Sequence, residues 1–390
     1  MESVQRNLTA PQRYMLLDGL RGIAALVVIC YHVGEGFATS SMDQVINHGY
    51  LAVDFFFMLS GFVIGKAYDG RWSSNRLTIG DFFRRRLVRL HPMLILGAVL
   101  GLVAFALQGF VQWNGTPVDI HWSLIALVLT MFFIPAYPGS PYEVRGNGEL
   151  FPLNGPAWSL FFEYIGNMAY ALILRRLSTK ALFAVTALSG IGLGVFAIGN
   201  GSGTYHLGVG WSLGDYNFIG GMLRLGFGFS AGLLMARVYV DRHIRGAFWI
   251  CTAGIVLLLS MPFVGDAESG TGWFNGLYDT VCVLLAFPAI LFVGASGDTG
   301  RERPGGFYDW LGRLSYPVYI VHYPLMYLFY AWVWAEGLAF AQCWHVALGV
   351  VSLSVLVAFV ALKYYDEPVR AWLSSRSSRK YSVAAPSKSV

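Results

Sequence analysis

Apolar segments of membrane length recur along almost the whole chain, and they limit its possible folds more than any other feature. The segments are 17 to 22 residues long, and about 20 apolar residues let one helix cross the ~30 Å hydrocarbon core of a bilayer. Charged residues make up only 13% of the 390 residues, whereas a soluble domain carries about 25%. Backbone polar groups in a bilayer must be paired within the protein, which favours helices for such segments. The sequence therefore predicts an all-α integral membrane protein.

We expect a bundle of about ten transmembrane helices. They are predicted at residues 16–37, 50–66, 92–110, 155–174, 181–199, 217–236, 247–264, 278–295, 315–335 and 344–364. A further apolar stretch near 122–137 is interpreted as a short re-entrant or interfacial segment. Counted as an eleventh crossing, it would place Arg175, Arg176 and Lys180 outside.

Ten crossings put both termini in the cytoplasm and agree with the distribution of basic residues. In this topology 25 of the 27 lysines and arginines lie on the cytoplasmic side, as the positive-inside rule requires. The net charge of +5 is then a topology signal, and no nucleic-acid partner is expected.

The domain organisation is simple. A cytoplasmic N-terminus (1–15) precedes one multi-pass membrane domain (16–366), and a polar cytoplasmic tail (367–390) is predicted to be disordered. The four cysteines form no C-x-x-C pair and no Cys/His cluster with ligand spacing, so no metal site is expected.

Two ionisable side chains lie in the first membrane segment, in the run LDGLRGIAALVVICYH. Arg21 and His32 are eleven positions apart, which on an α-helix is about 1100° of rotation and about 16 Å of rise. Both side chains are therefore expected on the same face, one near each end. Ionisable groups inside a bilayer are energetically expensive and usually functional, so we predict a reaction centre here.

Two carboxylates are predicted at a similar depth to His32. Asp54 lies about four residues from the outer end of the second span, and Glu163 about eight residues from the outer end of the fourth. A structural ion pair between Asp54 and a buried cation explains this residue as well as a functional role does. Deeper groups such as Arg224 and His322 are better explained by structural hydrogen bonding.

A basic run stands ahead of Pro92, in FFRRRLVRLHP. Arg84, Arg85, Arg86 and Arg89 are predicted at the cytoplasmic end, level with Arg21. They are suited to anchor the helix by the positive-inside rule or to bind phosphate, because guanidinium groups form bidentate contacts with phosphate.

Together these motifs resemble the acyltransferase-3 family of multi-pass membrane acyltransferases. The resemblance runs from about residue 14 to 366 and rests on LDGLRGIAALVVICYH, AVDFFFMLSGF, RRLVRLHP, WSLFFE and LGRLSYPVYIVHYPL. The family's Arg-or-Lys and His of the first helix match Arg21 and His32, and its paired arginines match Arg86 and Arg89. His91 departs from the pattern, since a bulkier apolar or aromatic residue usually precedes the proline.

The resemblance implies transfer of an acyl group, by default acetyl, from cytoplasmic acyl-CoA to a hydroxyl of an extracytoplasmic carbohydrate or related acceptor. A bacterial inner membrane is the implied location, with membrane lipid as the surroundings. The oligomeric state is not predicted, and neither the acceptor nor the acyl length is fixed by the motifs. A proton-coupled transporter that uses the same buried groups is the main alternative, followed by a glycosyltransferase acting on lipid-linked sugars.

The site residues are assigned on this basis. His32 is the expected general base, with a transient acyl carrier as the alternative role, and Glu163 or Asp54 would orient it. The residues expected to bind the coenzyme are Arg21, Arg85, Arg86 and Arg89, and Arg21 is also an expected catalytic residue. The residues expected to bind the substrate are Trp158, Ser159, Arg224, Tyr319 and His322.

Overall fold

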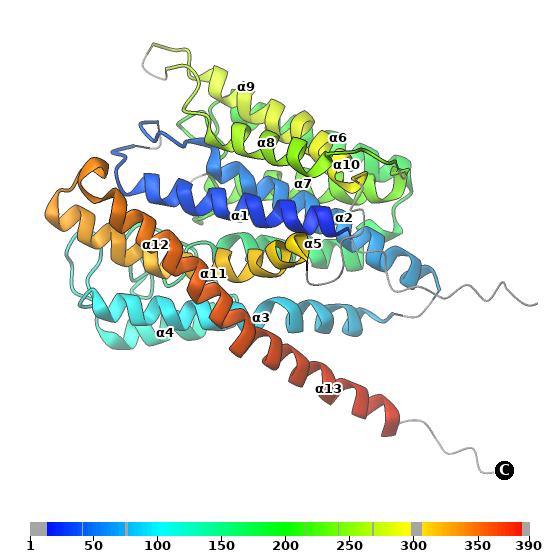
Figure 1. Cartoon of the computed structure of the whole chain (residues 1–390), viewed down its shortest axis with the longest axis horizontal. Coiled ribbons are helices and arrows are strands. Elements are labelled where there is room, and N and C mark those ends of the chain that lie inside the picture. The colour runs from blue at the N-terminus through cyan, green and yellow to red at the C-terminus, as the bar shows by residue number, and fades with distance from the viewer. Residues whose placement is uncertain are drawn as a thin grey trace, which may run out of the picture. The chain divides into compact units, whose positions relative to one another are not determined.

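Helices form where the apolar segments predict them, in a computed structural model of the chain (Figure 1). The structure describes residues 14–40, 42–74, 77–214, 216–240, 242–266, 269–297 and 306–383, with side chains as far as residue 376. Within these ranges no strand forms, and eight helices are long and apolar enough to cross a membrane. The prediction of an all-α, multi-pass membrane bundle is confirmed.

The contacts divide the chain into two compact units, each made of two segments. Unit 1 is Met1–Thr78 with Trp158–Ser315, and unit 2 is Ile79–Ala157 with Tyr316–Val390. The helices of unit 1 are α1 (Met15–Glu35), η1 (His48–Leu51), α2 (Ala52–Ser73), α5 (Ala157–Leu172), η2 (Leu174–Arg176), α6 (Thr179–Ile198), α7 (Asn217–Val238), α8 (Ala247–Ser260), α9 (Trp273–Val281), η3 (Cys282–Ala286) and α10 (Phe287–Ala295). The helices of unit 2 are α3 (Ile79–Leu107), α4 (Ile120–Met131), α11 (Phe307–Glu336, whose first residues belong to unit 1), α12 (Phe340–Ala361), η4 (Leu362–Asp366) and α13 (Glu367–Val383).

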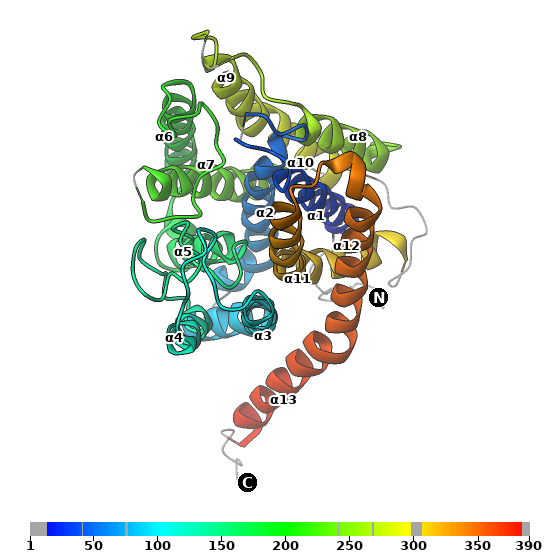
Figure 2. The same ribbon diagram turned by 90° about the vertical axis from the view of Figure 1, so that its left-hand side faces the viewer.

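Small residues determine the central packing of unit 1. Gly61 of α2 and Gly232 of α7 face the backbone of the opposite helix, and a Cβ at Gly232 would lie 2.7 Å from Phe62 N. Such close approach of backbones is typical of helix pairs in membranes, where van der Waals packing drives association. On its other side α7 packs against α6 (Figure 2).

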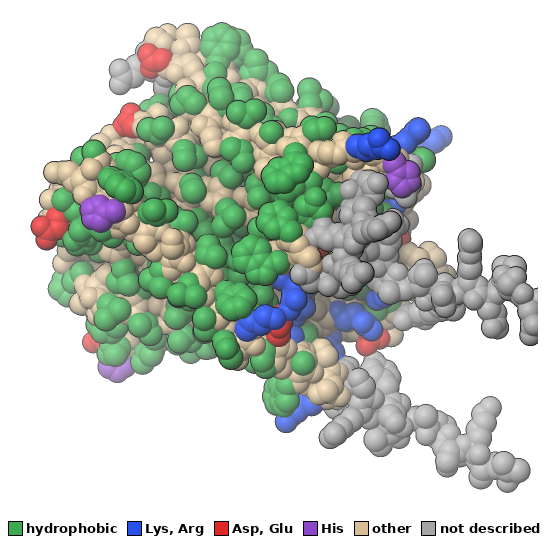
Figure 3. Space-filling model, viewed as in Figure 1, with side chains coloured by type: hydrophobic (Ala, Val, Ile, Leu, Met, Phe, Trp, Pro, Cys, Tyr) green, Lys and Arg blue, Asp and Glu red, His purple; other side chains and the backbone are tan. Residues whose placement is uncertain are grey.

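Exposed apolar side chains fit a membrane environment. Leu188, Ile191 and Val195 are exposed along one stripe of α6, and hydrophobic side chains dominate the face drawn in Figure 3. A soluble protein rarely exposes so much contiguous apolar surface.

In unit 2, α3 and α4 lie side by side (Figures 1 and 2). Their contact is a small core that includes Phe105, Ala126 and Leu153. Helix α4 has only 12 residues and therefore a length of about 18 Å, which is too short to cross the bilayer. This agrees with the interpretation of 122–137 as a short segment.

Several element boundaries differ from the prediction, and three of these are the end of α8, the start of α3 and the start of the tail. Helix α8 has 14 residues and ends at Ser260, before Met261 and Pro262, because the residue before a proline disfavours the helical conformation. Its length is about 21 Å, so like α4 it is shorter than a full crossing, and the complete span expected at 247–264 does not form. Helix α3 begins at Ile79 and contains Pro92 in its interior, so the expected start at the proline is wrong. Membrane helices tolerate interior prolines because neighbouring groups pair the carbonyl that is left.

The third difference concerns the tail. The chain continues from α12 through η4 into α13 (Figure 1), so residues 367–383 of the segment expected to be disordered are helical. Residues 384–390 and 1–13 lie outside the described part of the chain.

Candidate active site

Helix α1 carries both ionisable groups that the sequence singles out. It runs without interruption from Met15 to Glu35, so Arg21 and His32 are on one helix and about 16 Å apart along its axis. His32 lies in the last turn.

The partner of His32 is Glu35, which the sequence analysis did not select. His32 Nδ1 and Glu35 Oε2 are 2.6 Å apart, and the two side chains are 15% and 34% exposed. The spacing of three residues places both on one face of the last turn. That spacing is the signal that could have identified Glu35, since the predicted span 16–37 contains both residues.

At the other end of α1, Arg21 is held by α11. Its Nε donates to Ser315 Oγ at 2.8 Å and its Nη2 to the carbonyl of Gly312 at 2.9 Å. Asp18 lies 3.4 Å from the same Nη2. Arg21 therefore ties α1 to the first turns of α11, and 24% of its side chain is exposed.

Asp54 forms a buried ion pair with Arg224. The two side chains are 0% exposed and 2.7 Å apart at Oδ2 and Nη2. Arg224 also donates to the carbonyls of Val209 and Tyr50, at 2.6 and 2.7 Å. Both charges are thus neutralised inside the bundle, which agrees with a structural ion pair.

The second predicted carboxylate, Glu163, contacts α2. Ser60 Oγ donates to Glu163 Oε1 at 2.8 Å, which brings together two motifs that are 103 positions apart in the chain. Trp158, one turn earlier in α5, lies with its ring 5.2 Å from the guanidinium carbon of Arg224. Ser159 beside it is buried.

The basic run belongs to unit 2, in the first turns of α3. Arg85 is exposed, Arg89 is half-buried and Arg86 is buried. Arg84 Nη2 donates to the carbonyl of Leu373 in α13 at 3.5 Å. The run is thus presented on several faces of the helix and not on a single one.

Tyr319 and His322 lie in α11 and are both buried. His322 Nδ1 donates to the carbonyl of Val318 in its own helix at 3.0 Å. The Tyr319 hydroxyl makes a long contact of 3.5 Å with the carbonyl of Pro156.

A buried charged group in the loop before α5 was also missed. Arg145 is 0% exposed, and its guanidinium carbon lies 3.7 Å from the centre of the Tyr327 ring. The Tyr327 hydroxyl donates to Glu149 Oε2 at 2.5 Å. Burial raises the pKa of Glu149 to about 7.

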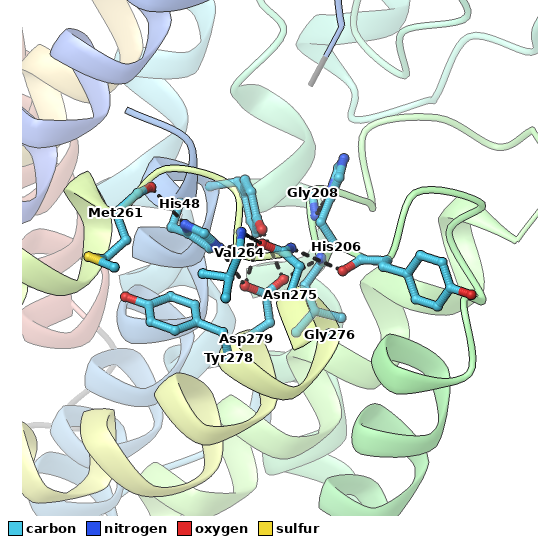
Figure 4. Close-up of polar contacts among 12 residues, drawn as sticks. His48, His206, Gly208, Met261, Val264, Asn275, Gly276, Tyr278 and Asp279 are labelled. Atoms are coloured by element: carbon cyan, nitrogen blue, oxygen red, sulfur yellow. Dashed lines mark hydrogen bonds and ion pairs between the residues drawn. The ribbon is translucent and has the colours of Figure 1, made fainter. Parts of the chain in front are cut away.

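A second buried polar cluster lies between η1 and α9, where His48, Asn275 and Asp279 point toward one another (Figure 4). His48 Nδ1 faces the carbonyl of Met261 at 2.8 Å, and its Nε2 faces Asn275 Oδ1 at 3.0 Å. Asp279 accepts from the Tyr50 hydroxyl at 2.9 Å. Nearby, burial lowers the pKa of His206, in the loop before α7, to about 4.

The arrangement in unit 1 can support proton transfer. A half-buried imidazole is bonded to a carboxylate at the end of α1, whereas Asp54 and Arg224 neutralise one another. Such a His–carboxylate pair is suited to general base catalysis near neutral pH.

Comparison with known proteins shows which family the chain resembles. Residues 16–363 match the family described as an acyltransferase domain. Protein 2 of the picA locus of Rhizobium radiobacter is 38% identical over 194 residues, which are 48% of this chain and 96% of that protein. No solved structure matches.

Two further relatives align over most of the chain. The acyltransferase MdmB of Streptomyces mycarofaciens is 26% identical over 374 residues, covering 88% of this chain and 87% of MdmB. YrhL of Bacillus subtilis (strain 168), provisionally named a peptidoglycan O-acetyltransferase, is 24% identical over 373 residues, covering 91% of this chain but 54% of YrhL. The chain thus spans about half the length of YrhL. Since the family match extends from α1 to the end of α12, the chain belongs to the acyltransferase-3 family of multi-pass membrane acyltransferases.

Proposed function

We propose that this membrane acyltransferase moves an acyl group, by default acetyl, from cytoplasmic acyl-CoA to a hydroxyl of an extracytoplasmic carbohydrate. Membership of the family supports acyl transfer. The name of YrhL, whose stated target peptidoglycan is a carbohydrate polymer, supports an O-acetyl product.

His32 is proposed as the general base. Its Nε2 takes the proton of the acceptor hydroxyl, and the oxygen forms a bond to the thioester carbonyl carbon. The carbon–sulfur bond then breaks, and the coenzyme thiolate leaves with the proton that His32 carried. The products are an ester and free coenzyme A. A positioned base contributes about 10²–10⁴-fold to such a step.

The basic start of α3 is proposed to bind the phosphates of the donor. Arg85 and Arg89 are accessible there, and guanidinium groups suit phosphate. Arg21 is proposed at the same, cytoplasmic, end of the protein. Trp158, Ser159, Tyr319 and His322 stay proposed contacts of the substrate, whereas the enclosed Arg224 is better assigned to structure.

The single observation that carries the proposal is the family match that includes His32, set in the last turn of α1 with a carboxylate on its ring. The test is transfer of label from acetyl-CoA to a crude cell-envelope polysaccharide fraction, in purified membranes, by wild type and His32→Ala. His345→Ala is the matched control, because His345 is an exposed histidine on another membrane helix, α12.

We expect label in the polysaccharide with wild type and His345→Ala but not with His32→Ala. Equal transfer by wild type and His32→Ala would remove His32 from the chemistry. Hydrolysis of acetyl-CoA without labelled polysaccharide would reject this acceptor. An absence of both turnover and coenzyme binding would favour the proton-coupled transporter instead.

A further inference from the structure

We propose that Glu35 is a positioning residue for His32, and that its carboxylate holds the imidazole in the tautomer in which Nε2 accepts the proton of the acceptor hydroxyl. This inference rests on the proposed function of His32 and deepens it, because it names the group that prepares the base.

The geometry of the pair sets the proton positions. Glu35 Oε2 lies 2.6 Å from His32 Nδ1, and an ionised carboxylate only accepts hydrogen bonds. His32 Nδ1 must therefore carry a hydrogen. In the neutral imidazole the other nitrogen, Nε2, then has the lone pair.

Tyr31 packs against the imidazole from the same turn. Its ring lies edge-on to the His32 ring, with 4.9 Å between the centres. Gln44 Nε2 donates to the Tyr31 carbonyl at 2.6 Å and anchors the same turn. The imidazole is thus packed against an aromatic ring on one side while Glu35 bonds its Nδ1.

The position in the helix adds an electrostatic effect. His32 lies in the last turn of α1, where the partial negative charge of the helix terminus stabilises a cation. Glu35 adds a full negative charge at hydrogen-bond distance. Both act on the imidazolium that forms after proton abstraction, so the effect of Glu35 is expected mainly in kcat.

Asp54 and Glu163, the two carboxylates first expected to orient His32, have partners of their own. Both oxygens of Asp54 accept from Arg224, and Glu163 Oε1 accepts from Ser60. Glu35 is hydrogen-bonded to His32 Nδ1, so we assign the orienting role to Glu35.

The direct test is ¹⁵N NMR of the full-length protein with labelled histidine, using His32→Gln to identify the His32 signals. Above the titration range of histidine, wild type should show a protonated Nδ1 and an unprotonated Nε2. Glu35→Gln should keep this tautomer, because the amide oxygen still accepts, whereas Glu35→Ala should lose the preference for it. The same tautomer in Glu35→Ala would overturn the proposal.

Kinetics provide the second readout. We expect Glu35→Gln to lower kcat by about 10- to 100-fold, with the KM for acetyl-CoA unchanged, which is part of the 10²–10⁴-fold contribution of a base. Glu35→Ala should be slower still. Glu336→Gln, a change in the exposed last residue of α11, is the matched control and should behave as wild type.

The two proposals fail differently. If His32→Ala transfers acetyl normally, the proposed base is wrong whatever the tautomer. If His32→Ala is inactive but both Glu35 variants keep the kcat of wild type, the base stands and the positioning role is wrong.

Discussion

At the scale of single residues, the Asp54–Arg224 pair makes the strongest prediction about stability. Removing one partner leaves the other charge buried and unpaired, which destabilises a protein by about 3–5 kcal/mol. Asp54→Asn should therefore lower the free energy of unfolding in detergent by about this amount, as measured by thermal or denaturant unfolding.

The double variant Asp54→Leu, Arg224→Met is the control, because it removes both charges. It should be more stable than Asp54→Asn. A single variant as stable as wild type would mean that the pair is not a structural requirement.

Glu149 predicts a pH dependence of stability. Its pKa is about 7 in the folded protein, against 4.5 for the ordinary side chain, because the carboxyl is buried. The folded state therefore keeps the proton between pH 4.5 and 7, where the unfolded state has lost it. The free energy of unfolding should fall by about 3 kcal/mol as the pH rises through this range.

Glu149→Gln removes the titrating group and should abolish this slope. The measurement is chemical unfolding of both proteins at pH 5 and pH 8. An equal slope in wild type and variant would assign the pH dependence to other groups.

Residue by residue, the sequence identified individual ionisable groups better than their partners. His32 and Arg21 stand out because charge is rare in an apolar run. The pairing of Asp54 with Arg224 joins positions 170 apart, and no local pattern contains it. Glu35 could have been identified from the sequence, since it follows His32 at a helical spacing of three within the predicted span 16–37.

At the scale of elements, the α2–α7 contact depends on glycine. A Cβ at Gly232 would meet the backbone carbonyl oxygen of Met58, and neither backbone can move without separating the helices. Gly232→Ala should lower the free energy of unfolding by about 1–3 kcal/mol. Thermal unfolding of the purified protein measures this.

Gly70→Ala is the control for that variant. Gly70 also lies in α2, but nothing comes within 4 Å of a Cβ placed there. The change should be neutral or stabilise the helix by up to about 1 kcal/mol. Equal changes in stability for Gly232→Ala and Gly70→Ala would mean that helix propensity, and not packing, determines the effect of replacing these glycines.

The basic start of α3 gives a kinetic prediction. Arg85→Ala with Arg89→Ala should raise the KM for acetyl-CoA more than it lowers kcat, if these two accessible arginines serve binding of the ground state. Steady-state kinetics in membranes measure both constants. Equal losses in kcat and kcat/KM would contradict a binding role.

The positions of helices were predictable where the length and apolarity of a segment are sufficient to define it. The spans at 181–199 and 217–236 agree closely with α6 and α7. The start of α3 was not predicted, because a proline and four arginines resemble a boundary, whereas the helix continues through both. The end of α8 before Pro262 follows the ordinary rule for prolines, but the apolar run alone extends past it.

At the scale of the whole molecule, the distribution of lysine and arginine predicts the topology. Fluorescent reporters fused after Lys180 and after the C-terminus should report the cytoplasm. A reporter in the loop of residues 132–156 should report the outside. A cytoplasmic signal from that loop would require a different number of crossings.

The buried ion pair also has a consequence for synthesis of the chain. Asp54 and Arg224 are 170 residues apart, so at about 5–20 residues per second Asp54 leaves the ribosome roughly 10–30 s before Arg224 exists. During that interval α2 enters the membrane without its counter-ion, and α7 later brings its arginine into a bundle that already contains the carboxylate. The order of insertion is therefore constrained, and α2 must stay accessible until α7 arrives.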